Sequence, residues 1–232
     1  MNTFQVIGNT KIVEKQTEWN MVTKELESES IKLMSYDYTL ISQISNWSGK
    51  KVLDYGAGPG VLAKALQKQG AEIKVYDINP EMREKAGQKI GYENIFHTIS
   101  DIPKNNFDVV ICNLVLCIVS EDEVENIISN IRLTLKPGGK AFVGFCNPKI
   151  HNVAESQLDF RFFSGVEYEK NHTYKKIKKE GLYEIVEIHR PVDWYSKFFQ
   201  EVGLMVLDII TTPEYKIRND RITDFVIFKL EK

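Results

Sequence analysis

The sequence predicts an α/β protein whose parallel sheet carries helices on both faces. Apolar runs of strand length alternate with helical segments along the chain, as expected for a doubly wound sheet. One unit is especially clear: an apolar run at 52–53 leads into a turn with glycines at 56, 58 and 60, and residues 61–66 then have a helical pattern. With 232 residues, 43% of them hydrophobic, one domain with a sizeable core is expected.

The first half of the chain has clear local signals for each element. Asn79 and Pro80 are typical of a helix start, as N-cap and first-turn residue. Ser120 and Glu123 have the spacing of a capping box. Proline and glycines in 136–139 indicate a turn. The predicted order is helices 11–30 and 31–44, strand 52–54, helix 61–66 ended by Gly70, strand 74–79, a helix from 79–80, strand 95–99, strand 107–113, helix 120–135 and strand 141–145.

The second half is expected to add an insertion and then complete the sheet. An irregular polar segment over 147–174 precedes a hairpin with arms 174–178 and 182–189, which turns at Glu180-Gly181. A last helix over 191–202, ended by Gly203, and strands 204–211 and 222–230 follow. These elements divide the single domain into an N-terminal helical cap (1–48), a core (49–146), an inserted lid (147–190) and a C-terminal helix with strands (191–232).

The glycine turn has the geometry of a ligand site, because backbone N–H groups and a helix N-terminus can face a bound molecule there. Counted from Gly56, the dinucleotide-binding motif Gly-x-Gly-x-x-Gly requires its third glycine at position 61, where this chain has Val61. Counted from Gly58, the motif is matched in part, with Ala63 in place of its third glycine. Asp54 places a carboxylate at the strand end, where it would repel a pyrophosphate and attract an ammonium group. The residues therefore favour a cationic, phosphate-free ligand.

The run VLDYGAGPG, residues 52–60, resembles the first motif of class I S-adenosylmethionine-dependent methyltransferases. Segments 74–79, 107–113 and 135–145 resemble the following motifs of that family, in the same order. The chain is most similar to the small-molecule type, the broad ubiquinone-biosynthesis-like group (methyltransferase types 11 and 12). This resemblance implies a Rossmann-like seven-stranded sheet of order 3-2-1-4-5-7-6, with an antiparallel last strand and a small lid after strand five. It also implies S-adenosylmethionine as cofactor.

The resemblance assigns cofactor roles by position. Asp54 would stabilise the α-ammonium group, and Asp77 would accept hydrogen bonds from the ribose hydroxyls. Asn113 would face the sulfonium and its methyl group. Around the adenine, Thr98 stands where the family often has an acid, with Asp101 as an alternative. The implied cofactor-binding residues are Asp54, Gly56, Ala57, Gly58, Gly60, Asp77, Ile78, Thr98, Ile99 and Asn113.

For the methyl acceptor, the resemblance points to the N-terminal helices and the insertion, both rich in aromatics. Such a lining suits a small organic molecule, although the same aromatics would equally fill the core of a lid. His189 would be a general base, because its ordinary pKa is near neutrality; alternatively, it ties the hairpin to the last helix with Arg190. Cys117 stands where the family often has a histidine. The substrate-binding candidates are Trp19, Tyr36, Cys117 and Arg190.

Other functions are less well supported. A net charge of −2 and a pI near 6.1 give no general attraction to nucleic acid. Residues 113–116 lack the proline pair of base-methylating enzymes, and the lysines in 175–179 are expected to solvate an exposed hairpin. No metal-ligand spacing, membrane span or signal peptide is evident, and three cysteines fit a reducing, cytoplasmic compartment. The leading hypothesis is methyl transfer to an O, N or C atom of a small metabolite. An RNA or protein methyltransferase and a non-catalytic cofactor-binding protein are the alternatives.

Overall fold

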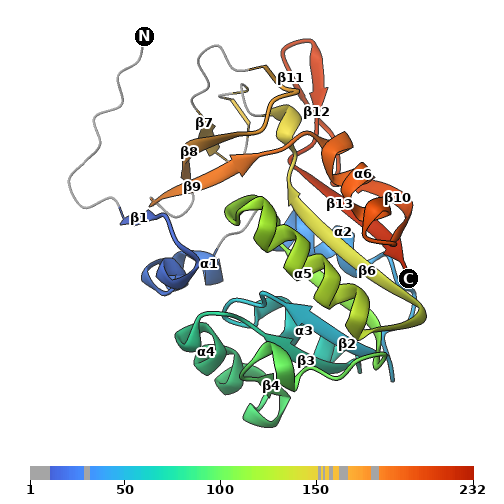
Figure 1. The fold of residues 1–232 in the computed structure, drawn as a ribbon. Helices are drawn as coiled ribbons and strands as arrows, with labels where there is room; N and C mark the ends of the chain where they lie inside the picture. The colour runs from blue at the N-terminus through green and yellow to red at the C-terminus, as the bar shows by residue number, and fades with distance from the viewer. Residues whose placement is uncertain are drawn as a thin grey trace.

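The computed structural model describes residues 11–28, 32–150, 153, 155–156, 159–161, 167–178 and 183–232. Seven strands form a central sheet in the order β10-β13-β6-β5-β2-β3-β4 (Figure 1). The strands are β2 (Lys51–Tyr55), β3 (Glu72–Tyr76), β4 (Ile95–Phe96), β5 (Phe107–Asn113), β6 (Leu135–Cys146), β10 (Met205–Thr211) and β13 (Phe225–Glu231).

This topology confirms the predicted fold class. The strands β4, β3, β2, β5 and β6 are parallel to one another, whereas β13 is antiparallel to both β6 and β10. Counted along the chain, the sheet has the order 3-2-1-4-5-7-6. The reversal of strand order next to β2 opens a crevice at the carboxyl ends of the parallel strands, where such sheets bind ligands.

Helices cover both faces of the sheet. The main helices are α3 (Val61–Lys68), α4 (Pro80–Ile90), α5 (Glu121–Thr134) and α6 (Val192–Glu201). Two predicted caps are present: the Asn79 side chain accepts the Glu81 N–H at 2.9 Å, and the Glu123 carboxylate accepts the Ser120 N–H at 2.8 Å. Alternate residues of β5 enter different cores, because strand side chains alternate between faces: Val110 packs on the α5 side and Val109 on the α3 side.

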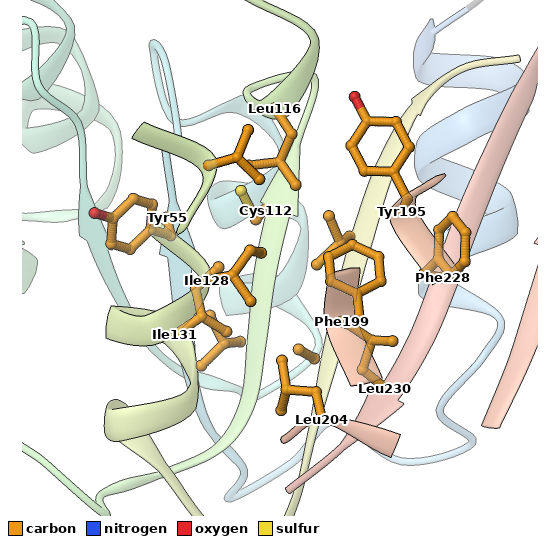
Figure 2. Packing of buried hydrophobic residues seen from close by; sticks show 14 of the residues in the cluster. Tyr55, Cys112, Leu116, Ile128, Ile131, Tyr195, Phe199, Leu204, Phe228 and Leu230 are labelled. Carbon is orange, nitrogen blue, oxygen red and sulfur yellow. The ribbon is translucent and has the colours of Figure 1, made fainter. Parts of the chain in front are cut away.

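Figure 2 shows the core on the α5 side of the sheet. Ile128 and Ile131 of α5 face the sheet there, while Tyr195 and Phe199 of α6 pack close to Phe228 of β13. Burial of these large side chains stabilises the arrangement, since a fully buried apolar side chain contributes roughly 1.5–3 kcal/mol. This core fixes the ends of β5 and β6, from which site residues extend.

A second, four-stranded sheet has the order β1-β9-β8-β7 (Figure 1). Its strands are β1 (Lys11–Val13), β7 (Asp159–Arg161), β8 (His172–Lys178) and β9 (Tyr183–His189). The predicted hairpin is confirmed, since β8 pairs with β9 in antiparallel fashion; its turn at Glu180-Gly181 lies outside the described residues. The helix predicted over 11–30 is wrong at its start, where residues 11–13 form β1 and pair in parallel with β9.

The N-terminal segment follows its prediction only in part. A 310 helix, η1 (Gln16–Val22), leads into α1 (Thr23–Ser28). A π-helical segment, η2 (Lys32–Asp37), then leads into α2 (Tyr38–Ile41). The helical segment ends at Ile41 rather than at residue 44, and the Trp47 indole N–H donates to the Ile41 carbonyl at 2.9 Å, which satisfies a terminal helix acceptor.

Several other boundaries also differ from prediction, among them the strand predicted over 74–79, which is β3 and ends at Tyr76. Strand β4 ends at Phe96, because Thr98 is the N-cap of the 310 helix η4 (Ile99–Asp101). The Thr98 N–H donates a hydrogen bond to the Asp101 carboxylate rather than to a neighbouring strand. The predicted turn at 136–139 is a register irregularity inside β6. Ile222 belongs to an unforeseen hairpin rather than to the last strand. The remaining elements are β11 (Tyr215–Ile217), β12 (Asp220–Ile222), η3 (Tyr92–Asn94), η5 (Leu116–Ile118) and η6 (Pro148–Ile150).

Candidate functional site

A cavity of about 290 Å³ lies at the carboxyl ends of the parallel strands, between the central sheet and the small sheet. Its volume is near the lower end of the range for small-molecule sites. The predicted residues that line it are Trp19, Asp54, Gly56, Ala57, Gly58, Asp77, Ile78, Ile99 and Asn113. Those not among its lining residues are Tyr36, Gly60, Thr98, Cys117, His189 and Arg190.

The glycines of the turn after β2 differ in what they contribute. Both Gly56 and Gly58 have positive φ angles, +78° and +55°, which favour glycine. A Cβ on Gly56 would lie 2.4 Å from a methyl carbon of Val115, so this glycine allows close packing. A Cβ on Gly58 would meet nothing within 4 Å. Gly58 therefore presents bare backbone to open space, where a ligand can lie.

Gly60 serves helix packing rather than the cavity. It is the N-cap of α3, and a Cβ there would lie 3.0 Å from the Cα of Ala86 in α4. That distance would force the two helices apart. The three glycines of one motif thus have three different surroundings.

Asp54 is a buried carboxylate at the end of β2, only 2% exposed. Among the described residues, no donor hydrogen-bonds to this carboxylate. Burial raises its pKa to about 7; Lys32 opposes this shift, and the negative charges of Asp37 and Asp77 add to it. A buried carboxylate that borders a cavity and has no donor of its own fits a cationic ligand group. The α-ammonium of an amino-acid ligand has this chemistry.

Asp77, directly after β3, is held by the neighbouring loops. Its carboxylate accepts the Gly58 N–H at 2.8 Å and the Asn79 N–H at 2.9 Å. Burial raises the pKa of Asp77, while these two hydrogen bonds oppose that shift. Ile78 and Ile99 border the cavity nearby and provide apolar surface. This end of the cavity therefore combines an oriented carboxylate with apolar walls, as a nucleoside requires.

Asn113 ends β5 at the middle of the cavity. Tyr36 does not line the cavity, but its hydroxyl donates a hydrogen bond to the Asn113 Oδ1. Tyr36 fits because its neighbour in β6 is Gly144, where a Cβ would lie 1.9 Å from the Tyr36 hydroxyl. The next residue, Leu114, has a φ of +58°, a strained conformation for a bulky side chain. Strain of this kind is concentrated at functional sites.

Lys32 is a cavity residue that sequence reasoning missed. Its Nζ lies 2.7 Å from the Asp37 Oδ1, in the π-helical segment η2. A lysine in a polar helical segment is expected to be solvent-exposed, so the sequence does not indicate that Lys32 lines the cavity. The π-helical geometry that turns this segment is itself frequent at functional sites.

Comparisons with known proteins agree with this geometry. The sequence profile of a methyltransferase domain family, described as "Methyltransferase domain", matches residues 53–143. The chain is 26% identical over 212 residues to a ubiquinone biosynthesis O-methyltransferase of Coxiella burnetii, covering 88% of this chain and 84% of that protein. Residues 53–143 form a methyltransferase domain, and these findings support a class I S-adenosylmethionine-dependent methyltransferase.

Two further likenesses extend this result. A phosphoethanolamine N-methyltransferase of Triticum aestivum is 27% identical over 192 residues, which cover 75% of this chain but only 38% of that protein. The fold of an S-adenosylmethionine-dependent methyltransferase from Clostridium acetobutylicum superposes with a TM-score of 0.61 at 15% identity, covering 91% of this chain and 96% of that one. At that identity, the superposition shows the fold alone.

The side of the methyltransferase cavity opposite Asp77 is formed by the small sheet. Lys176 and Glu187 border it, with side chains 1% and 3% exposed, and they form an ion pair. The expectation that the basic run solvates an exposed hairpin is therefore wrong for Lys176, although Lys175 is exposed. Successive side chains of a strand point to opposite faces, so Lys175 and Lys176 lie on opposite faces of β8. No pattern in the sequence indicates which face of β8 is covered.

Aromatic residues of the methyltransferase occupy several environments. Trp19 lines the cavity and makes an edge contact with Tyr183, with ring centroids 6.5 Å apart. Tyr183 also lines the cavity, and Tyr174 is buried in β8. Tyr38 is 71% exposed. Phe162 and Phe163, two further aromatic residues of the insertion, lie outside the described residues.

His189, Arg190 and Cys117 border a small second cavity of about 10 Å³. The His189 Nε2 lies 2.6 Å from the Tyr168 carbonyl oxygen. Arg190 donates to the carbonyls of Leu116 and Val119, at 2.8 Å each. The Arg190 bonds tie the end of the hairpin to the segment after β5, and the His189 contact ties it to the segment before β8. They give no support to a general-base role for His189 in the large cavity.

Two kinds of feature are not found among the residues that the structure describes. No helix is long and apolar enough to cross a bilayer. No group of three or more His, Cys, Asp or Glu side chains is placed to hold a metal ion. Metal-independent chemistry remains a sequence prediction.

Proposed function

We propose that this methyltransferase transfers the methyl group of S-adenosylmethionine to an O, N or C atom of a small-molecule metabolite. The observation that carries the proposal is one cavity with two chemically different ends. Asp54, Asp77 and the bare backbone of Gly58 border one end. The Lys176–Glu187 pair of the small sheet borders the other. A mostly apolar lining with a few polar groups is typical of small-molecule sites.

The end of the cavity bordered by Asp54, Asp77 and Gly58 is called the donor end, and the opposite end the acceptor end. At the donor end, each group would bind one part of the cofactor. Asp77 would accept hydrogen bonds from the ribose hydroxyls, and Asp54 would stabilise the α-ammonium group. Ile78 and Ile99 would contact the adenine. Asn113, oriented by Tyr36, would lie near the sulfonium. The sulfonium supplies a methyl group that is ready for displacement.

The chain's main contribution would be alignment. Methyl transfer is an in-line displacement, and holding both reactants in reacting geometry removes much of the entropic barrier. A base is needed only if the acceptor atom starts protonated. The small sheet and the N-terminal segment would exclude water, because they pack together through Val13, Val22, Tyr183 and Ile185.

Isothermal titration calorimetry with S-adenosylmethionine measures the dissociation constant of the cofactor and so tests the donor site. We expect micromolar binding by the wild type and a loss of about 10-fold to 100-fold for Asp77→Ala, since hydrogen bonds to a charged group contribute about 1.5–3 kcal/mol. Asp108→Ala is the matched control. Its carboxylate also accepts a backbone N–H, from Lys51 at 2.9 Å, but it stands at the opposite end of the parallel strands. Equal affinities for the two variants would contradict the proposal.

Transfer of labelled methyl groups tests the acceptor class. We expect product with members of a panel of phenols, amines and carboxylic acids, and none with total RNA or a protein extract. Labelled RNA or protein would overturn the small-molecule assignment. Tight cofactor binding without transfer to any acceptor would favour a non-catalytic cofactor-binding protein.

A further inference from the structure

The Asn113 amide lines the middle of the cavity, and a residue outside the cavity holds its orientation. That residue is Tyr36, whose hydroxyl donates a hydrogen bond to the Asn113 Oδ1. We propose that Tyr36 is a positioning residue, which turns the NH2 group of Asn113 towards the cavity so that it binds an oxygen atom of the methyl acceptor. The inference rests on the proposed function, because it concerns the acceptor in the same cavity.

The order of the strands places Asn113 between the two ends of the cavity. Asn113 is the last residue of β5, which lies between β2 and β6 in the central sheet. Asp54 near the end of β2 and Cys146 at the end of β6 both line the cavity. Cys146 also contacts the small sheet, since its Sγ lies 3.3 Å from the Lys176 Nζ. An amide on β5 is therefore placed where the donor and the acceptor would meet.

The burial of Tyr36 decides which way the amide points. Tyr36 is fully buried, and among the described residues the Asn113 Oδ1 is the one atom to which its hydroxyl donates. A buried hydroxyl proton without an acceptor is costly, so the amide oxygen, and not the amide nitrogen, faces Tyr36. Burial, together with the negative charge of Asp37, raises the pKa of Tyr36 well above its ordinary value. The hydroxyl therefore remains a donor at neutral pH.

Two neighbours hold Tyr36 in this position. Its ring makes an edge contact with the ring of Phe225, with centroids 5.0 Å apart. Gly144 is the residue paired with Asn113 in the β5–β6 register, and a Cβ there would lie 1.9 Å from the Tyr36 hydroxyl oxygen. The absence of a side chain at Gly144 thus allows the hydroxyl to reach Asn113.

The remaining hydrogen-bonding capacity of Asn113 decides what it can bind. Among the described residues, no acceptor hydrogen-bonds to its Nδ2, so two N–H donors are available to a ligand in the cavity. These donors do not suit the sulfonium, because its positive charge repels the positive end of an N–H dipole. They suit an atom with lone pairs.

An oxygen atom fits this position better than an amine nitrogen. An oxygen has two lone pairs, so it can accept a hydrogen bond from Asn113 and keep one lone pair for the methyl group. An ammonium group has no lone pair, and the single lone pair of a free amine would be occupied by the hydrogen bond. The orientation of Asn113 therefore favours an acceptor that is held through oxygen.

Three fragments with the same ring test this inference: phenol, aniline and toluene, all uncharged at neutral pH. Each is titrated into the isotope-labelled full chain saturated with S-adenosylhomocysteine, and NMR follows the side-chain NH2 signals of Asn113, identified by their loss in Asn113→Asp. We expect phenol to move these proton signals downfield relative to toluene, which controls for the effect of the ring. Aniline should behave as toluene does. No difference between phenol and toluene, or a larger downfield shift with aniline, would overturn the proposal.

Tyr36→Phe tests the positioning role, because it removes the hydroxyl and keeps the ring beside Phe225. The amide can then turn over, so we expect the preference for phenol over toluene to fall about 3-fold to 10-fold, as for the loss of one neutral hydrogen bond. Tyr195→Phe is the matched control, since Tyr195 is also buried but packs on the other face of the sheet. An unchanged preference in Tyr36→Phe, or an equal fall in Tyr195→Phe, would overturn the positioning role.

Gly144→Ala reaches the same hydrogen bond by a second route and leaves both partners in place. Its Cβ would displace the Tyr36 hydroxyl, so we expect the phenol preference to fall as it does in Tyr36→Phe. Circular dichroism establishes that each variant is folded before the titrations. A folded Gly144→Ala with the wild-type preference would contradict the inference, and if this variant does not fold, Tyr36→Phe decides the question alone.

Binding of S-adenosylhomocysteine separates the two proposals. We expect its dissociation constant to change less than about threefold in Tyr36→Phe, because Tyr36 is not among the residues that line the cavity. Failure of the wild type to bind S-adenosylhomocysteine would overturn the proposed function. Normal binding combined with an unchanged fragment preference in Tyr36→Phe would overturn only the role of Tyr36.

Discussion

The donor and acceptor ends of the cavity are built in different ways. The donor end comes from consecutive units of the central sheet, and its polar groups lie at the carboxyl ends of β2, β3 and β5 or directly after them. The acceptor end comes from β8 and β9, whereas the N-terminal segment that includes Trp19 covers the cavity on the side of Asn79. A local motif is enough to build the first, whereas the second requires distant segments to pack. Sequence motifs therefore identify the donor much better than the acceptor.

The largest expected effect concerns the stability of the acceptor end. Lys176→Met should lower the free energy of unfolding by about 3–5 kcal/mol, because it leaves the Glu187 carboxylate buried without its partner. The double variant Lys176→Met/Glu187→Met should recover most of that loss, since it removes both charges. Urea denaturation monitored by circular dichroism measures both values. Equal losses in the single and double variants would show that packing, rather than charge, dominates this end.

A smaller effect is expected for the glycines of the donor end, and it separates packing from binding. Gly56→Ala should lower the free energy of unfolding by about 2–4 kcal/mol, because its Cβ would overlap Val115 and its φ is positive. Gly58→Ala should cost only about 1 kcal/mol in stability. It should nevertheless weaken S-adenosylmethionine binding at least about 10-fold, because the added methyl group enters the open space. Thermal melting and calorimetry on the same samples would show whether these effects separate as expected.

A still smaller effect is the pH dependence of donor binding. With the pKa of Asp54 at about 7, its carboxyl group is mostly neutral at pH 5.5 and half ionised at pH 7. An α-ammonium group prefers the ionised form, so affinity should rise about 15-fold over this interval, while the α-amino group itself stays protonated. Calorimetry at a series of pH values measures the slope, and Asp54→Asn should abolish most of it. A flat wild-type profile would mean that Asp54 does not contact the ammonium group.

The smallest expected effect concerns His189. This residue lies at the second cavity, with its Nε2 against the Tyr168 carbonyl. His189→Gln should therefore change kcat less than about threefold, whereas loss of a general base costs about 10²-fold to 10⁴-fold. The measurement is the steady-state rate with an acceptor identified in the panel. A loss of 100-fold or more would restore the catalytic hypothesis and place the reaction nearer to the hairpin.

Most of the central sheet was predictable, because each strand and helix carries its own local signal. Asn79 and Ser120 cap helices as expected, and Asp54 and Asp77 lie together at the cavity, as the strand ends require. Gly60 shows the limit of a motif. Its spacing suggests a ligand contact, but the structure places it against Ala86.

The acceptor end was largely unpredictable, for a physical reason. Period-two alternation in β8 shows that Lys175 and Lys176 face opposite sides, but only the covering elements decide which side is buried. Parallel pairing of residues 11–13 with β9 depends on a partner near the other end of the chain. Lys32 enters the cavity through a π-helical segment, a geometry that no local pattern indicates.

The pairing of β1 with β9 also has a consequence for how the molecule is assembled during synthesis. Strands β2 to β6 are made close together in time, so the donor end can form while translation continues. Strand β1 is made before them, yet its partner at residues 183–185 follows only after the whole parallel part of the sheet. Contacts between such distant segments form slowly, because a large loop must close first. A growing chain would therefore gain the ability to hold the methyl donor before it has a wall against which an acceptor can bind.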